Sequence, residues 1–289
     1  MRIIQPSELI INEDGSIFHL HLKPEQLSDK IILVGDPGRV PTVASYFDTT
    51  EFDISSREFR SITGTYKGKR LTVLSHGIGS DNIDIVLNEL DALANVDFNT
   101  RTVKSDFKQL TLVRIGTSGG LQPFTPIGSY VVAEKSIGFD GVIYFYANNE
   151  DIRDVDFEAE LLKQLNWQMA GLWPYAVNAD ASLVEQIAKD DLIRGITIAT
   201  NGFYGPQGRE VRLALTDPTL NQKIEAFDYK GSKITNYEME SSALAALSAL
   251  MGHRAMTVCC IIAGRVNKEM NTSYKGSLTE LIETVLERI

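Results

Sequence analysis

The segment Arg114–Gly120, which reads Arg-Ile-Gly-Thr-Ser-Gly-Gly, is the part of the sequence best suited to holding an anion. It overlaps the end of the apolar run Leu110–Ile115, which is typical of a buried strand. In open α/β sheets, ligands bind at the carboxyl ends of strands, and small residues there let backbone N–H groups approach an oxyanion. We therefore expect a strand, a glycine-rich turn and an anion-binding arginine. The alternative is a surface arginine in an ion pair beside an ordinary turn.

Two further glycine-rich loops directly follow predicted strands. Gly35–Arg39 (Gly-Asp-Pro-Gly-Arg) follows Ile31–Val34, and His76–Gly79 (His-Gly-Ile-Gly) follows Leu71–Ser75. We expect all three loops at one edge of a sheet, where the Arg39 guanidinium can bind an oxyanion through two N–H groups. These loops carry neither a Walker phosphate-binding pattern nor a dinucleotide fingerprint. A structural turn with an exposed arginine is the alternative for Gly35–Arg39.

The loop Phe203–Arg209 combines groups that suit a planar heterocycle. Phe203 offers an aromatic face, Gln207 presents both a donor and an acceptor, and Arg209 presents donors only. This set matches the edge of a ring that bears carbonyl groups and a ring N–H. The alternative is a surface loop shaped by its glycines and proline.

Two carboxylates, Glu238 and Glu240, precede a strongly apolar helical segment. Buried carboxylates are costly unless they are paired or used. Glu240 would otherwise need an internal cation, so we expect it to bind a ligand. A carboxylate there can accept hydrogen bonds from sugar hydroxyls.

Short apolar runs alternate with helical patterns along the whole chain, which predicts an α/β fold. We expect one domain over residues 1–289, with a three-layer α/β/α architecture and a central mixed β-sheet. The predicted helices are Asp81–Ala94, Glu240–Met251 and Ser277–Ile289. The predicted strands are Ile31–Val34, Leu71–Ser75, Leu110–Ile115, Ser129–Ala133, Ile193–Thr200 and Met256–Ile262.

The overall composition argues against several classes of binding partner. The 289 residues carry a net charge of −10, which disfavours nucleic acid or an anionic membrane as the main partner. No apolar run is long enough to span a membrane, and no signal peptide is evident. The adjacent Cys259 and Cys260 point to opposite strand faces, so we expect no bridge between them and a reduced, cytoplasmic protein. No histidine and cysteine spacing indicates a metal site.

Together these motifs resemble the nucleoside phosphorylase family, and within it the uridine phosphorylases. The resemblance extends from Phe18 to about residue 265. Its specific motifs, which occur in the family's order, are Gly35–Arg39, Ser56–Phe59 (Ser-Arg-Glu-Phe), Arg114–Gly120 and Glu238–Ser241 (Glu-Met-Glu-Ser).

The resemblance implies reversible cleavage of a nucleoside by inorganic phosphate, which is a co-substrate, with no cofactor. Gly35, Arg39, Arg114 and Thr117 would hold the phosphate, and Arg57 would reach it from a neighbouring subunit. Glu240 would bind the ribose hydroxyls, and Arg114, Gln207, Arg209 and Glu240 would carry the catalysis. The nucleoside-binding set implied by the resemblance is His19, Thr117, Ser118, Gly119, Phe203, Gln207, Arg209, Glu238, Met239, Glu240 and Arg265.

The preference for a pyrimidine depends on two local features. The loop Phe203–Arg209 looks like the uracil-binding loop of the family, and Arg265 matches an arginine that supports the uracil side. Residues 261–265 (Ile-Ile-Ala-Gly-Arg) lack the aspartate used by the purine-specific branch. Two departures are Gly264, where an asparagine is usual, and residues 96–109, which look like an insertion.

The resemblance also implies an oligomer, since His19 and Arg57 would complete the site of a neighbouring subunit. We expect a homodimer or a hexamer built from dimers. Three alternatives to a uridine phosphorylase stay open from the sequence: a purine nucleoside phosphorylase, a hydrolytic nucleosidase and a non-catalytic nucleoside-binding protein.

Overall fold

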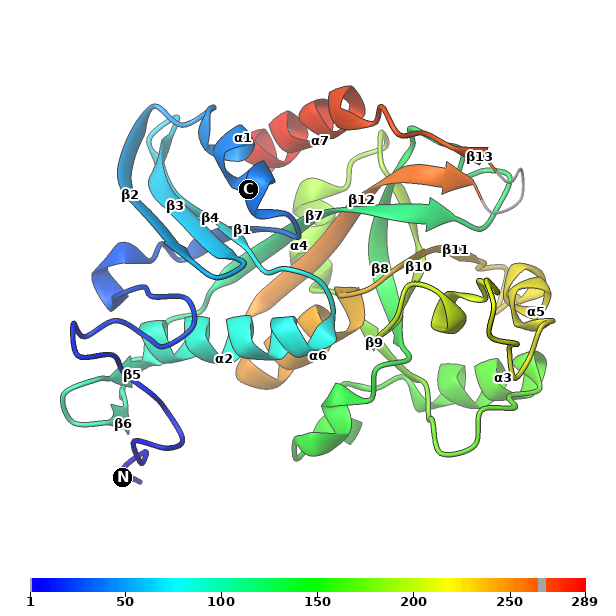
Figure 1. Ribbon diagram of the computed structural model, residues 1–289, viewed down its shortest axis with the longest axis horizontal. Helices are drawn as coiled ribbons and strands as arrows, with labels where there is room; N and C mark the ends of the chain where they lie inside the picture. Colours follow the sequence, from blue (N-terminus) through cyan, green and yellow to red (C-terminus); the bar gives the residue numbers. More distant parts are fainter. Residues whose placement is uncertain (1, 265–268) are drawn as a thin grey trace.

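A computed structural model describes residues 2–264 and 269–289 of the chain (Figure 1). Within these residues, eleven strands form one large mixed sheet, and two short strands pair separately. The strands are β1 (Lys30–Val34), β2 (Thr49–Ser56), β3 (Phe59–Tyr66), β4 (Lys69–Ser75), β5 (Val96–Asp97), β6 (Thr102–Val103), β7 (Thr111–Gly120), β8 (Tyr130–Gly138), β9 (Tyr175–Asn178), β10 (Ile193–Ala199), β11 (Ile234–Glu238), β12 (Arg254–Gly264) and β13 (Glu269–Met270).

The parallel strands β4, β1, β7 and β12 lie side by side in that order. Their carboxyl ends therefore point to one edge of the sheet, as the sequence predicted for the loops after Val34 and Ser75. All six predicted strands are present, although their observed bounds differ by one to several residues.

One expectation about this edge was wrong, because Gly116–Gly120 is not a turn. Strand β7 continues through these glycines and pairs with both β12 and β11. A side chain at Gly120 would come within 2.4 Å of the Thr125 carbonyl oxygen. The glycines therefore allow other backbone and side chains to pass close to a continuing strand, which is a use of glycine that the sequence does not distinguish from a turn.

The extension of β7 closes part of the sheet into a ring. β12 pairs with β8, β8 with β10, β10 with β11, and β11 returns to β7 (Figure 1). Because β11 runs antiparallel to β7 and β10 runs parallel to β11, both strands lead back toward the middle of β7. Their following loops thus approach the residues around Arg114.

Helices cover both faces of the sheet, in agreement with the expected layers. On β1, Ile32 and Val34 pack with α1, α4 and α7, whereas Ile31 and Leu33 pack with α2 and α6. The helices α3 and α5 cover the part of the sheet formed by β8, β10 and β11. The helices are α1 (Val40–Ala44), α2 (Ser80–Asn95), α3 (Val155–Leu165), α4 (Ala181–Ile187), α5 (Leu220–Ala226), α6 (Ser241–Met251) and α7 (Lys275–Arg288).

The segment 96–109 contains the short pair β5 and β6. The two cysteines are free and buried, and they face opposite sides of β12 as expected: Cys260 packs with α7, and Cys259 approaches Arg114. Within the described residues, no helix has the length and apolar character needed to cross a membrane.

We expect opposite effects on stability from two glycine-to-alanine substitutions. Gly120→Ala forces a contact with the Thr125 carbonyl and should destabilise the fold by about 1–3 kcal/mol. Gly276→Ala lies in α7 with open space around it and should stabilise the fold by about 0.5 kcal/mol. Urea-induced unfolding measures both values. A neutral Gly120→Ala variant would contradict the tight packing of β7.

Candidate functional site

A cavity of about 860 Å³ lies at the carboxyl ends of β1 and β4 and beside the middle of β7. It brings together twelve of the fifteen residues that the sequence analysis selected, from four separate parts of the chain. Those twelve are Gly35, Arg39, Arg114, Thr117, Ser118, Gly119, Phe203, Gln207, Arg209, Glu238, Met239 and Glu240.

Arg39 is held at the edge of the cavity by a capped turn. Asp36 accepts a hydrogen bond from the backbone N–H of Gly38 (2.8 Å), which fixes the turn before α1. The Arg39 guanidinium donates to the carbonyl oxygen of Ile115 (3.3 Å) and so lies next to β7. Burial lowers the pKa of Arg39, and the positive charge of Arg114 lowers it further. A bound anion would relieve this repulsion.

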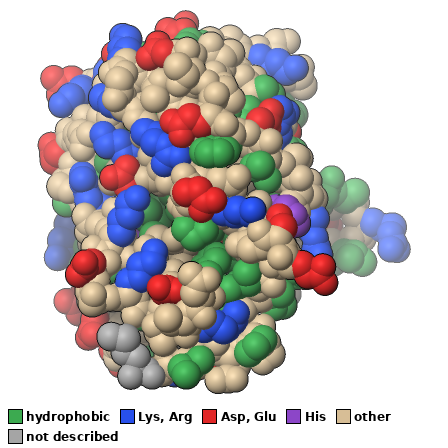
Figure 2. All heavy atoms as spheres, turned by 90° about the vertical axis from the view of Figure 1, so that its left-hand side faces the viewer, with side chains coloured by type: hydrophobic (Ala, Val, Ile, Leu, Met, Phe, Trp, Pro, Cys, Tyr) green, Lys and Arg blue, Asp and Glu red, His purple; other side chains and the backbone are tan. Residues whose placement is uncertain are grey.

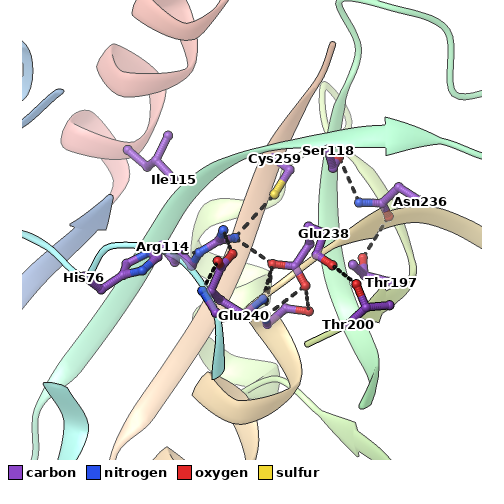
Figure 3. Close-up of polar contacts among 12 residues, drawn as sticks. His76, Arg114, Ile115, Ser118, Thr197, Thr200, Asn236, Glu238, Glu240 and Cys259 are labelled. Atoms are coloured by element: carbon purple, nitrogen blue, oxygen red, sulfur yellow. Dashed lines mark hydrogen bonds and ion pairs between the residues drawn. The ribbon is translucent and has the colours of Figure 1, made fainter. Parts of the chain in front are cut away.

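Arg114 is the buried centre of the site, with 4% of its surface exposed (Figure 3). Its Nη1 lies 2.9 Å from a Glu238 carboxylate oxygen, and its Nη2 pairs with Glu240. Its Nε donates to Nε2 of His76 (3.1 Å), and Nη1 also contacts the Cys259 sulfur (3.6 Å). Arg114 is therefore a buried cation that already forms ion pairs with two carboxylates.

The two carboxylates are also held by backbone groups. Glu238 accepts from the backbone N–H groups of Glu240 and Ser241 at the start of α6, and Glu240 accepts from that of Gly79 (2.7 Å). Burial and the neighbouring Glu238 charge raise the pKa of Glu240, while Arg114 opposes this shift. The sequence argument for Glu240 was incomplete, since the cation it needs is present in Arg114.

Thr117, Ser118 and Gly119 line the cavity from within β7 rather than from a turn. The Ser118 hydroxyl accepts a hydrogen bond from the side chain of Asn236 (3.0 Å) on β11. This bond ties the two strands together beside the cavity, so the Ser118 side chain has a structural partner.

The aromatic loop forms another wall of the cavity. The Arg209 guanidinium stacks on the Phe203 ring, 3.7 Å from its centroid, and donates to Oε1 of Gln207 (2.6 Å). Gln207 is buried, its side-chain amide donates to the hydroxyl of Thr200 (3.0 Å), and its backbone carbonyl accepts from the side chain of Asn221 (3.2 Å). The expected combination of ring, amide and guanidinium is thus present and already ordered.

Two predicted residues do not line this cavity. His19 bonds through Nδ1 to Glu89 (2.6 Å), and Arg57 lies over the Phe18 ring at 5.7 Å. Arg57 lies in the turn between β2 and β3, and the His19 ring lies 6.4 Å from the ring of Phe59 at the start of β3. On the side of the molecule that carries these strands, acidic and basic side chains are interspersed with apolar ones (Figure 2). The single chain therefore does not bring His19 and Arg57 to its own cavity. A third predicted residue, Arg265, lies outside the described residues.

The structure adds residues that the sequence analysis did not select. Glu58 and Asn82 line the cavity near Gly77. His76 accepts a hydrogen bond from Nε of Arg114. The sequence signal for His76 was its place directly after a buried strand at the same edge. Its partner could not be inferred, because Arg114 is on a strand two positions away in the sheet.

Comparisons with known proteins show the family to which the chain belongs. A family model described as the phosphorylase superfamily matches residues 29–287. A uridine phosphorylase from Thermococcus kodakarensis is 30% identical over 89% of this chain and 80% of its own length. The structure of a Trypanosoma brucei nucleoside phosphorylase that shows uridine phosphorylase activity is 31% identical, with a TM-score of 0.86 over 97% of this chain and 98% of that one. A purine nucleoside phosphorylase from Streptococcus suis is 27% identical over 94% of this chain and 98% of its own length. The chain belongs to the phosphorylase superfamily.

Proposed function

We propose that this protein is a uridine phosphorylase, a pentosyltransferase that converts uridine and inorganic phosphate to uracil and ribose 1-phosphate. One observation carries the proposal. Arg39 and Arg114 meet at one end of a cavity whose other wall carries Phe203, Gln207 and Arg209. An anion site and a site for a planar heterocycle therefore share a single space.

The arrangement suits cleavage of a bond between a sugar and a base. Such cleavage develops positive charge on the ribose ring and negative charge on the leaving base. Phosphate held by Arg39 and Arg114 stabilises the first charge and acts as the nucleophile, with no cofactor needed. Glu240 holds the ribose hydroxyls, while Gln207 and Arg209 stabilise the uracil anion through ordered donors.

The choice of uridine over a purine nucleoside depends on the cavity residues rather than on overall similarity. Relatives of both kinds are similar to this chain at comparable identity. The stacked Phe203 and Arg209, with Gln207 beside them, supply donors and an acceptor for the N–H and carbonyl groups of uracil. A hydrolytic nucleosidase uses water in place of phosphate, so it would not need Arg39 and Arg114 at an anion site.

The proposal includes a homodimer or a hexamer in which sites are completed across the subunit interface. His19 and Arg57 lie away from the cavity of their own chain, so a neighbouring subunit is needed for them to act. We place the enzyme in the cytoplasm, in pyrimidine salvage.

The first test is a substrate panel run with and without phosphate. We expect uracil release from uridine only when phosphate is present, measured by chromatography. Release without phosphate would indicate a nucleosidase, and faster cleavage of inosine than of uridine would indicate a purine enzyme. Binding of uridine without turnover would indicate a non-catalytic nucleoside-binding protein.

Two arginine variants should separate the roles of the two ends of the cavity. Arg209→Ala removes a donor to the leaving base and should lower kcat for uridine by about 10²–10³-fold. Arg39→Ala should raise the KM for phosphate by about tenfold or more. The matched control is Arg194→Ala, which breaks a surface pair with Glu185 and should keep wild-type kinetics. Wild-type rates in both cavity variants would refute the assignment.

A third variant tests the placement of Arg114 without removing it. A side chain at Gly116 would lie 2.6 Å from Nη1 of Arg114 and 2.9 Å from the sulfur of Cys259. Gly116→Ala should therefore displace the guanidinium and lower kcat/KM by about 10²-fold, as measured by initial rates. Gly120→Ala on the same strand is the control, since it strains the fold without touching Arg114. Equal kinetics for the two variants would show that Arg114 needs no such space.

A further inference from the structure

His76 is a buried histidine in direct contact with the arginine at the centre of the site. It follows β4 and its surface is completely buried. Its Nε2 lies 3.1 Å from Nε of Arg114, while the two carboxylates and Cys259 contact the far end of that guanidinium (Figure 3). An arginine Nε is always a donor, so Nε2 of His76 is the acceptor and carries no proton.

The contact joins the end of β4 to β7, and a glycine on β7 leaves the space that the guanidinium occupies. β1 lies between β4 and β7, and it ends at Val34, directly before Gly35. A side chain at Gly35 would lie 3.8 Å from Cε1 of His76, and one at Gly116 would overlap Arg114. The distance at Gly35 is an ordinary van der Waals contact, so it is the missing side chain at Gly116 that leaves room for the guanidinium to meet the imidazole.

The histidine is retained at an energetic cost. With Nε2 as the acceptor, Nδ1 must carry the proton of the neutral ring, and among the described residues this buried atom makes no well-aligned hydrogen bond, its nearest acceptor being the Gly77 backbone. A buried donor with no partner at all costs about 1–3 kcal/mol, and the poorly aligned Gly77 backbone recovers only part of that loss. An apolar side chain of similar size would avoid this cost, so packing alone does not explain a histidine here.

The contact also requires the neutral ring. Burial lowers the pKa of His76 well below its ordinary value, and the positive charges of Arg114 and Arg39 lower it further. A charged imidazolium would have no acceptor for the Arg114 Nε–H. His76 is thus suited to be a permanent acceptor rather than an acid or a base.

The contacts of Arg114 show how the His76 acceptor orients the guanidinium. Nε is directed to His76, Nη1 to Glu238 and Cys259, and Nη2 to Glu240. Each Nη group has two N–H donors, so Nη2 retains a hydrogen beyond its single described partner. Fixing Nε fixes the plane of the guanidinium and therefore the direction of that remaining N–H.

We propose that His76 is a positioning residue that holds the Arg114 guanidinium in the plane required to bind the phosphate co-substrate. This inference rests on the proposed function, since it assigns phosphate as the anion. His76 itself touches no substrate in this scheme. It acts only through Arg114.

The test compares two substitutions of His76 by initial-rate kinetics. His76→Leu removes the acceptor and should raise the KM for phosphate by about tenfold, the equivalent of one hydrogen bond to a charged group. The KM for uridine should change less, because Glu238 and Glu240 keep their backbone donors. His76→Gln, whose amide oxygen can accept from Nε, should restore phosphate KM to within about threefold of the wild type.

His253 provides the matched control, since it is also buried but lies away from the cavity. Its ring bonds to Asp91 and to the backbone N–H of Leu110. His253→Leu and His76→Leu should both lower the melting temperature, but only the latter should raise the phosphate KM more than the uridine KM. Equal shifts of both constants, or a His76→Gln variant no better than His76→Leu, would overturn the proposal.

A measurement on the wild-type protein covers the case in which the variants do not fold. Side-chain nitrogen NMR of histidine-labelled protein should show His76 as the neutral ring with the proton on Nδ1 between pH 6 and pH 8. A proton on Nε2, or a charged ring, would overturn the proposal. If the wild type shows the expected ring but cleaves no nucleoside with phosphate, the proposed function fails while the His76 contact stands.

Discussion

The site depends on one buried cation. Arg114 lies within the sheet, almost completely removed from water, and carries two carboxylates, a thiol and an imidazole. An isolated charge at this depth would cost far more than a folded domain can offset, so the arginine can be buried there only because the two carboxylates compensate its charge. The same contacts bring the base-side strands and the phosphate-side loops to one point.

The burial of Arg114 explains the glycines of β7 better than a turn would. Gly116 leaves space for the guanidinium, and Gly120 lets β7 approach the Thr125 segment. Glycine in a strand interior weakens the strand, and here that cost is offset by the close approach of functional groups. The continuous β7 then serves as the common wall of the cavity from Arg114 to Gly119.

The closed ring of strands is the second requirement. β11 returns antiparallel to β7, so Glu238 and Glu240 arrive beside Arg114 although they are more than 120 residues away in the chain. β10 runs parallel to β11, and the loop that follows β10 carries Phe203, Gln207 and Arg209 to the same cavity. A flat sheet with the same strands would leave these loops at a distant edge.

The sequence by itself determined much of this protein. Apolar periodicity predicted six strands and three helices, because burial on one or both faces leaves a direct mark on residue type. Short or half-exposed elements such as β2, β9 and α5 leave a weaker mark, and they were not predicted. Glycine-rich motifs and charged groups at strand ends, together with the family resemblance that they support, identified twelve residues that line one cavity.

Only the tertiary structure decided which of these groups interact. It paired Arg114 with the two carboxylates, assigned His76 to Arg114, and placed His19 and Arg57 away from the cavity. It also showed that Gly116–Gly120 belongs to a strand. The physical reason is that pairing between distant segments depends on strand order and ring closure, which are set by the packing of the whole sheet and leave no local pattern in the residues themselves.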